Sequence, residues 1–168
     1  MIIEYSMAHD KVKPPTRANP SDAGLDIFYS PPKSESESLM IEAQGTAIIP
    51  TGLRFGVPHG YMLEVKNRSS VAAKRQLLVG ACVIDSGYDG EVFINLHNVG
   101  SAPQTINVGD KIAQVVMTPV VHFKAYCRHD GDLYSYPITI SDRGTGALGS
   151  TDEQIALPFD DHLVYNFT

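Results

Sequence analysis

The sequence has no long hydrophobic run, few cysteines and no signal-peptide pattern. No apolar stretch approaches the roughly 18 residues that a membrane-spanning helix needs, which excludes such a helix. The two cysteines, Cys82 and Cys127, are too few for a disulfide framework and lack the spacing of a paired metal motif, so we expect both to be reduced. The first residues, MIIEYSMAHDKVK, lack the basic segment and apolar core of a signal peptide, and we expect an intracellular protein.

Basic residues are in the minority: 13 Lys and Arg stand against 19 Asp and Glu, for a net charge of −6 at pH 7. An acidic chain with no basic run is a poor candidate for nucleic-acid binding, and we expect neither nucleic acid nor membrane as a partner. A phosphate ligand would have to be held locally, by a few arginines, backbone amides or a divalent cation. The 168 residues, 43% of them apolar, suit one domain with a sizeable core.

What the chain does have is alternation of apolar and polar residues, which indicates β-strands. In the stretch YMLEVKN, Tyr61, Leu63 and Val65 share one face, and the stretch VFINLHN alternates in the same way. Turn signals separate the strand candidates, which are residues 46–50, 61–67, 77–85, 92–98 and 111–121. Many short strands at this spacing are typical of an all-β sandwich or barrel.

One short helix and several irregular segments complete the pattern. The helix is predicted at residues 69–75 (SSVAAKR), with a serine available as its N-cap. Residues 31–40 read as a polar hairpin loop, and residues 134–140 as a last strand. We expect residues 1–140 to form one β domain, to which the glycine-rich residues 141–168 belong as a flexible C-terminal arm and tail.

The stretch at residues 80–92, GACVIDSGYDGEV, ends an apolar strand on Asp85 and then turns sharply around Tyr88. Taken alone, it is typical of a surface hairpin. Four other short motifs look equally ordinary one by one, as a turn, a helix cap, a strand entry and a flexible tail. They are residues 22–26 (DAGLD), 68–70 (RSS), 109–114 (GDKIAQ) and 143–151 (RGTGALGST). The joint occurrence of all five, in this order and spacing, is much more specific than any one of them.

In these five motifs the sequence resembles the trimeric dUTP diphosphatases (dUTPases), over about residues 22–151. The resemblance implies an all-β, distorted jelly-roll or β-clip fold with one short helix and a flexible C-terminal arm. It also implies a homotrimer with three active sites between subunits, which hydrolyses dUTP to dUMP and pyrophosphate with Mg²⁺ as cofactor. From the missing signal-peptide pattern, we expect the location to be the cytoplasm, or the host cytoplasm if the protein is viral.

The catalytic residues that the resemblance implies are Asp85, Gln114 and Asp26. Asp85 would be the base that polarises a water for in-line attack on the α-phosphorus. Gln114 would help to hold that water, and Asp26 would orient nearby groups or metal-bound water. Mg²⁺ would be held mainly by substrate phosphates and water, with Asp26 as the residue that could reach it, so no direct metal ligand is expected from the protein.

The resemblance also implies how the substrate is held. Arg68 and Ser69 would contact the phosphates, and Tyr88 would pack against the deoxyribose and leave no room for a 2′-hydroxyl. The backbone of the turn would pair with uracil, while Arg143 of the arm would reach the γ-phosphate. The substrate-binding set is Arg68, Ser69, Ser70, Cys82, Val83, Ile84, Tyr88, Arg143, Leu148, Gly149 and Ser150.

The chain departs from the family pattern at three places. The arm has Leu148 where the family usually has a phenylalanine that stacks on uracil. Asn67 and Ser70 replace the proline and glycine that usually flank Arg-Ser in the second motif. Cys82 replaces a glycine close to the base. Base selectivity is therefore open, and another deoxypyrimidine triphosphate or a modified pyrimidine remains an alternative substrate.

The sequence offers three alternative interpretations. A dCTP deaminase shares the fold and the Arg-Ser-Ser motif, but its catalytic glutamate aligns with Asn95, whose amide cannot shuttle protons. A regulator that binds a protein partner through the apolar-containing tail after Thr151 is a second alternative. A zinc site from His122, Cys127 and His129 is disfavoured, because the trio lacks paired CxxC spacing.

Overall fold

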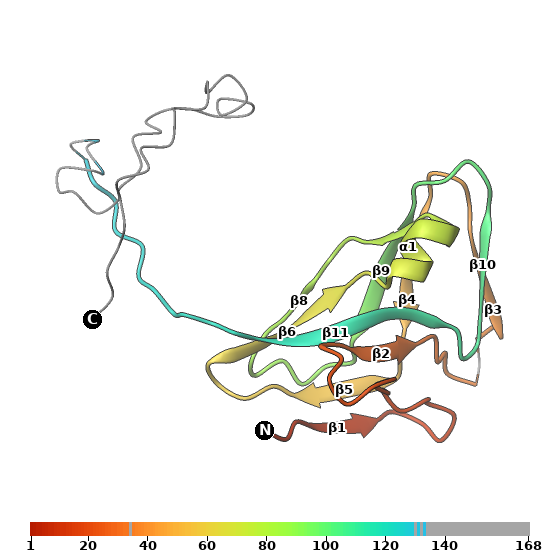
Figure 1. The fold of residues 1–168 in the computed structure, drawn as a ribbon, viewed down its shortest axis with the longest axis horizontal. Helices are drawn as coiled ribbons and strands as arrows, with labels where there is room; N and C mark the ends of the chain where they lie inside the picture. The colour runs from red at the N-terminus through yellow and green to blue at the C-terminus, as the bar shows by residue number, and fades with distance from the viewer. Residues whose placement is uncertain (34, 130, 132, 134–168) are drawn as a thin grey trace, which may run out of the picture. The chain divides into compact units, whose positions relative to one another are not determined.

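The computed structural model describes residues 1–33, 35–129, 131 and 133. The chain divides into two units, Met1–Phe123 and Lys124–Thr168, and every element of secondary structure described below belongs to the first. The elements are β1 (Glu4–Met7), β2 (Leu25–Phe28), β3 (Ser38–Ile41), β4 (Thr46–Pro50), β5 (Leu53–Gly56), β6 (Tyr61–Lys66), α1 (Ser69–Arg75), β7 (Leu77–Val79), β8 (Val83–Ile84), β9 (Phe93–Asn98), β10 (Gln104–Asn107) and β11 (Lys111–Pro119). The expected all-β fold with one short helix is confirmed for this part of the chain (Figure 1).

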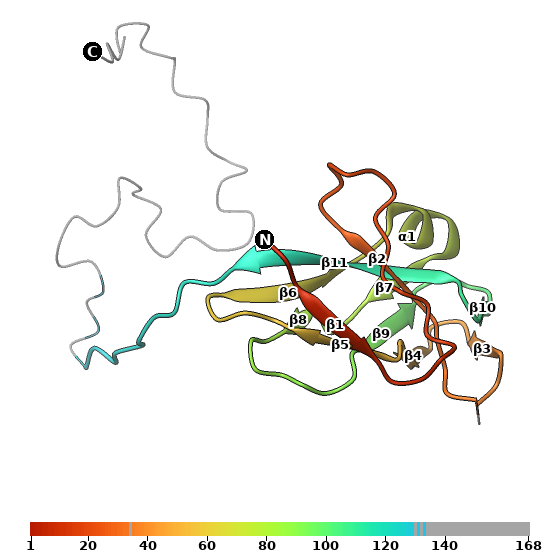
Figure 2. The same ribbon diagram turned by 90° about the horizontal axis from the view of Figure 1, so that it is seen from below.

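The strands form four antiparallel groups. The largest is a four-stranded sheet in the order β2-β11-β6-β8, and β4-β9-β7 form a three-stranded sheet. Two pairs, β1-β5 and β10-β3, complete the set. Figures 1 and 2 show β11 running between β2 and β6. No helix in the described residues is long and apolar enough to cross a membrane.

Alternation in the sequence correctly predicted which side chains form the core. Leu63 and Val65 of β6 are buried, and Ile94 and Leu96 of β9 have no exposed surface. The residue before Ile94, Phe93, is 48% exposed on the outer face of the β4-β9-β7 sheet. Because successive residues of a strand point to opposite faces of the sheet, the alternating pattern that predicts the buried residues also predicts which residues face solvent.

Strand β11 contains a register shift that positions the site. Lys111 pairs with Phe28 of β2, yet Ala113 pairs with the adjacent Ile27, so two steps along β11 oppose one step along β2. This is a β-bulge, which re-aims the side chains on either side of it. In a regular strand Lys111 and Gln114 would lie on opposite faces; the bulge brings both to the face of β2 that carries the partner of Gln114.

Helix α1 occupies the predicted residues, but its predicted N-cap is wrong. The cap position is Arg68, in extended conformation with no side-chain hydrogen bond to the helix, and the serine begins the helix as its first residue. The helix ends where Gln76 adopts the left-handed conformation, with φ 53°. Arg68 is therefore free of a capping role, and its side chain is available to the site.

Two other expectations need correction. Residues 77–85 do not form one strand but split into β7 and β8, which pair with β9 and β6 respectively. Residues 31–40 are not all loop, since β3 begins at Ser38 and pairs with β10. The strand expected at 134–140, and the arm and tail at 141–168, lie outside the described residues, and the division of the chain at residue 140 stays a prediction.

Candidate active site

The turn between β8 and β9 is a tight four-residue turn from Asp85 to Tyr88. The Tyr88 N–H donates to the carbonyl of Asp85 at 3.3 Å, and Gly87 takes φ 87°, which glycine alone adopts without strain. The turn does not close a hairpin as expected, because β8 pairs with β6 whereas β9 pairs with β4 and β7. The turn instead connects two sheets. Asp85 directly follows β8, the edge strand of the β2-β11-β6-β8 sheet, and the chain then enters β9 of the β4-β9-β7 sheet.

Tyr88 is held in one orientation by its own loop. Its hydroxyl donates to the carbonyl of Glu91 at 2.8 Å, and its ring covers Gly90 so closely that a Cβ there would collide with the ring. The ring remains 47% exposed. It therefore forms a wall whose orientation is set by its own loop.

This wall belongs to a pocket of about 250 Å³ that we call the turn pocket. Its lining residues are Val83, Ile84, Asp85, Tyr88, Glu91, Val92 and Phe93. Asp85 is exposed, and its carboxylate makes no ion pair or hydrogen bond with the described part of the chain. The neighbouring Cys82 is also exposed, and its carbonyl accepts the N–H of Val65 at 2.7 Å. A free carboxylate thus faces an aromatic ring and apolar walls.

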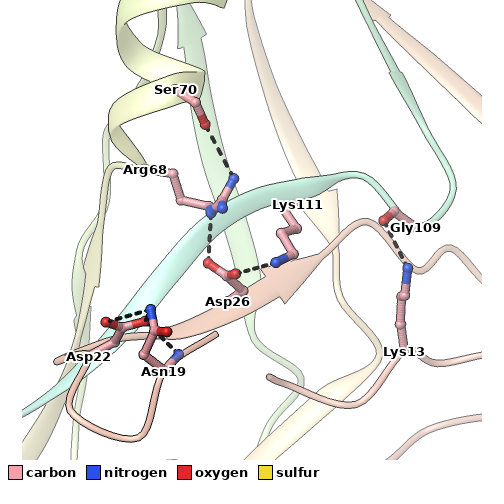
Figure 3. A network of polar contacts seen from close by, with 8 residues as sticks. All are labelled: Lys13, Asn19, Asp22, Asp26, Arg68, Ser70, Gly109 and Lys111. Carbon is pink, nitrogen blue, oxygen red and sulfur yellow. Dashed lines mark hydrogen bonds and ion pairs between the residues drawn. The ribbon is translucent and has the colours of Figure 1, made fainter. Parts of the chain in front are cut away.

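A second group of site residues centres on Asp26 (Figure 3), whose side chain is 12% exposed. Its Oδ1 accepts Arg68 Nε at 2.6 Å, and its Oδ2 accepts Lys111 Nζ at 2.7 Å. Arg68 Nη1 also reaches the hydroxyl of Ser70 at 3.4 Å. Three elements therefore converge here: β2 supplies the acid, the start of α1 supplies the arginine, and β11 supplies the lysine.

Lys111 and Arg68 keep the Asp26 carboxyl in its ionised form by lowering its pKa. Burial by itself would raise the pKa of this carboxyl, but hydrogen bonds from Lys111 and Arg68 outweigh burial and lower the pKa below its ordinary value. Asp26 is therefore ionised at neutral pH. Its negative charge is fully committed to its two partners.

Beside this network lies a pocket of about 170 Å³ that we call the phosphate pocket. It is lined by Ala18, Asp22, Gly24, Asp26, Arg68, Ser69, Ser70 and Gln114. Gln114 is held by a bond from its Nε2 to the carbonyl of Asn67 at 2.9 Å, and its carboxamide packs against Gly24 where a Cβ would collide with it. The pocket offers a guanidinium and two hydroxyls, the donors that a phosphate group needs.

The structure thus divides the predicted site between two pockets that share no lining residue. Asp85, Tyr88, Val83 and Ile84 line the turn pocket, while Asp26, Arg68, Ser69, Ser70 and Gln114 line the phosphate pocket. Arg143, Leu148, Gly149 and Ser150 lie outside the described residues. Lys111 was not predicted as a site residue, although it lies in the fourth motif. A positive side chain three residues before Gln114 was the available signal, and only the bulge in β11 reveals that its partner is Asp26.

The described residues offer no cage for a metal ion. Among them no group of three or more His, Cys, Asp or Glu side chains could hold one. Both oxygens of Asp26 are occupied by cations, and Asp22 is bonded to Asn19. This donor set fits a Mg²⁺ ion that is carried mainly by ligand phosphates and water, and it does not fit an all-protein site.

A family model described as dUTPase matches residues 10–151, most of the chain. The chain belongs to the dUTPase family. The deoxyuridine 5′-triphosphate nucleotidohydrolase of Gloeobacter violaceus is 36% identical over 139 residues, which cover 82% of this chain and 87% of that protein. The enzyme of the same name from Debaryomyces hansenii is 36% identical over 137 residues, covering 82% and 79%.

Solved dUTPase structures have the same fold as this dUTPase-family chain. The dUTPase from phage phi11 of S. aureus aligns with a TM-score of 0.70 and 25% identity, covering 81% of this chain and 100% of that one. The Staphylococcus bacteriophage 80alpha dUTPase with dUPNHPP aligns with a TM-score of 0.73 and 24% identity, covering 89% and 97%. The family resemblance read from the five motifs is confirmed.

Proposed function

We propose that this protein hydrolyses dUTP to dUMP and pyrophosphate, with Asp85 as the base. The observation that carries the proposal is the turn pocket, where a tyrosine ring fixed by its own loop shares one concave surface with a carboxylate that has no partner among residues 1–33, 35–129, 131 and 133. The apolar walls suit a base, and the ring suits a deoxyribose. The relatives described above, which are nucleotidohydrolases of deoxyuridine 5′-triphosphate, support the choice of substrate.

The chemistry follows from the position of Asp85. Its carboxylate accepts a proton from a water molecule as the water oxygen attacks the α-phosphorus, and the bond from that phosphorus to the bridging oxygen of the β-phosphate breaks. Pyrophosphate leaves, and dUMP retains the new oxygen. General-base assistance of this kind contributes about 10²–10⁴-fold to a rate. Because no cation neutralises Asp85 within the described residues, its lone pairs are available for the proton.

The phosphate pocket supplies charge and donors to the triphosphate. Arg68 offers its terminal nitrogens, and Ser69 and Ser70 offer hydroxyls at the start of α1. Gln114 lies across the same pocket, where its carboxamide can orient the attacking water. Mg²⁺, when bound to the phosphates, would neutralise part of their charge, and Asp26 would reach it through water because its oxygens are already bonded.

The divided site supports a homotrimer. The turn pocket has the base without a cation, and the phosphate pocket has the cation without an aromatic wall, so each is incomplete alone. We propose that a turn pocket of one subunit faces a phosphate pocket of another, and that Arg143, Leu148, Gly149 and Ser150 of an arm close over both. Ile48, 61% exposed, and Phe93 provide apolar surface for association.

Deamination is not supported by the position of Asn95. Its side-chain amide donates to Thr46 Oγ1 at 3.2 Å on the outer face of the β4-β9-β7 sheet, and it does not line the turn pocket. A protein partner bound through the tail remains an alternative role, which falls on residues outside the described part of the chain. A cytoplasmic location likewise stays a prediction.

The decisive experiment is a pyrophosphate-release assay with dUTP, dCTP, dTTP and UTP, each with and without Mg²⁺. We expect release from dUTP alone among the four at an appreciable rate, dependent on Mg²⁺. Release of ammonia from dCTP, or equal rates with dUTP and dTTP, would contradict the proposal.

A mixing experiment tests the divided site. Chains carrying Asp85→Asn and chains carrying Arg68→Gln should each be inactive, and a mixture refolded together should recover activity, because some sites then combine an intact base with an intact arginine. A mixture as inactive as its components, or full activity at a monomeric mass, would count against the trimer.

A further inference from the structure

Lys111 holds the second oxygen of the carboxylate that anchors Arg68. Lys111 Nζ lies 2.7 Å from Asp26 Oδ2, and Arg68 Nε lies 2.6 Å from Oδ1 (Figure 3). Two cations and one anion leave the group with one net positive charge. We propose that Lys111 is a positioning residue of the phosphate pocket, which keeps that charge in place for a triphosphate; the proposal rests on the function proposed above.

Lys111 acts through Asp26 and not on the ligand, since it does not line the phosphate pocket. Without Lys111, Asp26 and Arg68 would form a neutral pair, and the arginine would be tied to its carboxylate with no surplus charge. With Lys111 present, the lysine binds Oδ2 of Asp26 and offsets part of its negative charge. The terminal nitrogens of Arg68 therefore keep a positive charge that can attract an anion. The acid and the lysine together hold the arginine ready for phosphate.

The bulge in β11 makes this arrangement possible. Lys111 pairs with Phe28 and Gln114 pairs with Asp26, so both lie on the face of β2 that carries Asp26. Removing the extra residue would send Lys111 or Gln114 to the opposite face. The bulge therefore joins the water-orienting residue and the positioning lysine in one site.

Lys13 provides a matched control for Lys111. Both ammonium groups lie over the buried ring of Phe28, Lys13 Nζ at 4.6 Å and Lys111 Nζ at 5.9 Å from its centroid. Lys13 bonds to the carbonyl of Gly109 and makes no contact with Asp26 (Figure 3). Replacing either lysine by methionine removes one positive charge and keeps an apolar stem over the ring.

The experiment measures the affinity of dUPNHPP, dUMP and inorganic tripolyphosphate for the full-length protein by calorimetry. We expect Lys111→Met to weaken dUPNHPP and tripolyphosphate roughly tenfold, the range for loss of a charged hydrogen bond, and to leave dUMP within about twofold. Lys111→Arg should restore the affinity, and Lys13→Met should leave all three ligands within about twofold. Equal weakening by Lys13→Met, equal weakening of dUMP, or no rescue by arginine would overturn the proposal.

Tripolyphosphate separates this proposal from the proposed function. If the wild type binds tripolyphosphate but does not hydrolyse dUTP, the proposed function fails, and the comparison of Lys111→Met with Lys13→Met still decides the role of Lys111. If dUTP is hydrolysed and Lys111→Met binds both triphosphates as the wild type does, the proposed function stands and the positioning role is wrong. Thermal melting of each variant confirms that the proteins compared are folded.

Discussion

Asp26 and Asp85 are the two carboxylates predicted for this site, and their surroundings are opposite. Asp26 is 8% exposed, bonded at both oxygens and lowered in pKa by Lys111 and Arg68 against the effect of burial. Asp85 is exposed at the end of β8 and has no side-chain partner in the described residues. The same side chain thus serves as an anchor in one pocket and as a free acceptor in the other.

The contrast indicates which of the two carboxylates could act as a general base. A base must have a lone pair free for the incoming proton, and Asp26 has committed both oxygens to cations. A residue that positions other side chains must itself be held rigidly. The buried Asp26 suits that role better than the exposed Asp85. The difference comes from location: Asp26 lies on β2, where it pairs with Gln114 of β11 on one side and forms a single bridge with Thr16 on the other, while Asp85 lies where the chain leaves one sheet for another.

The largest expected effect comes from removing the free carboxylate. Asp85→Asn should lower kcat for dUTP by about 10²–10⁴-fold, because an amide cannot accept the proton, while nucleotide affinity is retained. Stability should change by less than about 0.5 kcal/mol, since the residue is exposed and its carboxylate has no partner in the described part of the chain. Steady-state pyrophosphate release and a denaturant titration measure the two quantities. Asp89→Asn, in the same exposed loop but outside the turn pocket, is the control that should keep its activity.

Removing the paired carboxylate should instead cost stability. Asp26→Asn leaves Arg68 and Lys111 without their shared counterion, and we expect a loss of about 1–3 kcal/mol, after allowance for screening of the more exposed Lys111. Urea unfolding measures this loss. Asp10→Asn breaks a fully exposed ion pair with Lys33 and should give no measurable change. Similar losses for the two variants would remove the distinction between an anchor and a surface acid.

Sugar selection tests the turn region further. Tyr88→Ala opens the space that the ring occupies, so turnover of UTP relative to dUTP should rise roughly tenfold, the range for loss of a close steric contact. Tyr88→Phe keeps the ring and loses only the bond to the carbonyl of Glu91, so its ratio should stay near that of the wild type. Competition assays with the two nucleotides give the ratio directly, and an unchanged ratio in the alanine variant would make Tyr88 an ordinary surface residue.

The smallest expected effect is a pH dependence of the Asp26 anchor. Because its folded pKa is lowered, its contribution to stability is fully present above the pKa of the unfolded chain, about 3.9, and is lost as pH falls through the folded pKa. The difference in unfolding free energy between the wild type and Asp26→Asn should therefore be constant from about pH 5 to 7 and shrink below about pH 4. A difference that grows on acidification would show that the pKa of Asp26 is raised in the folded protein.

Much of the fold was predictable because alternation directly encodes burial. β4 and α1 occur at the predicted residues, and β6, β9 and β11 lie within predicted strands. The strands that were missed, β1, β2, β3, β5 and β10, have four residues each, too few for a period of two to stand out. Residues 77–85 failed for another reason: one continuous apolar stretch serves two sheets, and which partner each half takes depends on strands elsewhere in the chain.

The sequence by itself determined the residue types at the site and the family to which they belong, because motif order and spacing are properties of the chain. It also determined which strand residues form the core, since the alternation of apolar and polar residues is visible in the sequence itself. Only the tertiary structure decided that Asp26, Arg68 and Lys111 meet and that the Asp85 carboxylate has no side-chain partner among the described residues. These residues are far apart in sequence, and their contacts depend on strand register and on one bulge in β11, which no local pattern records.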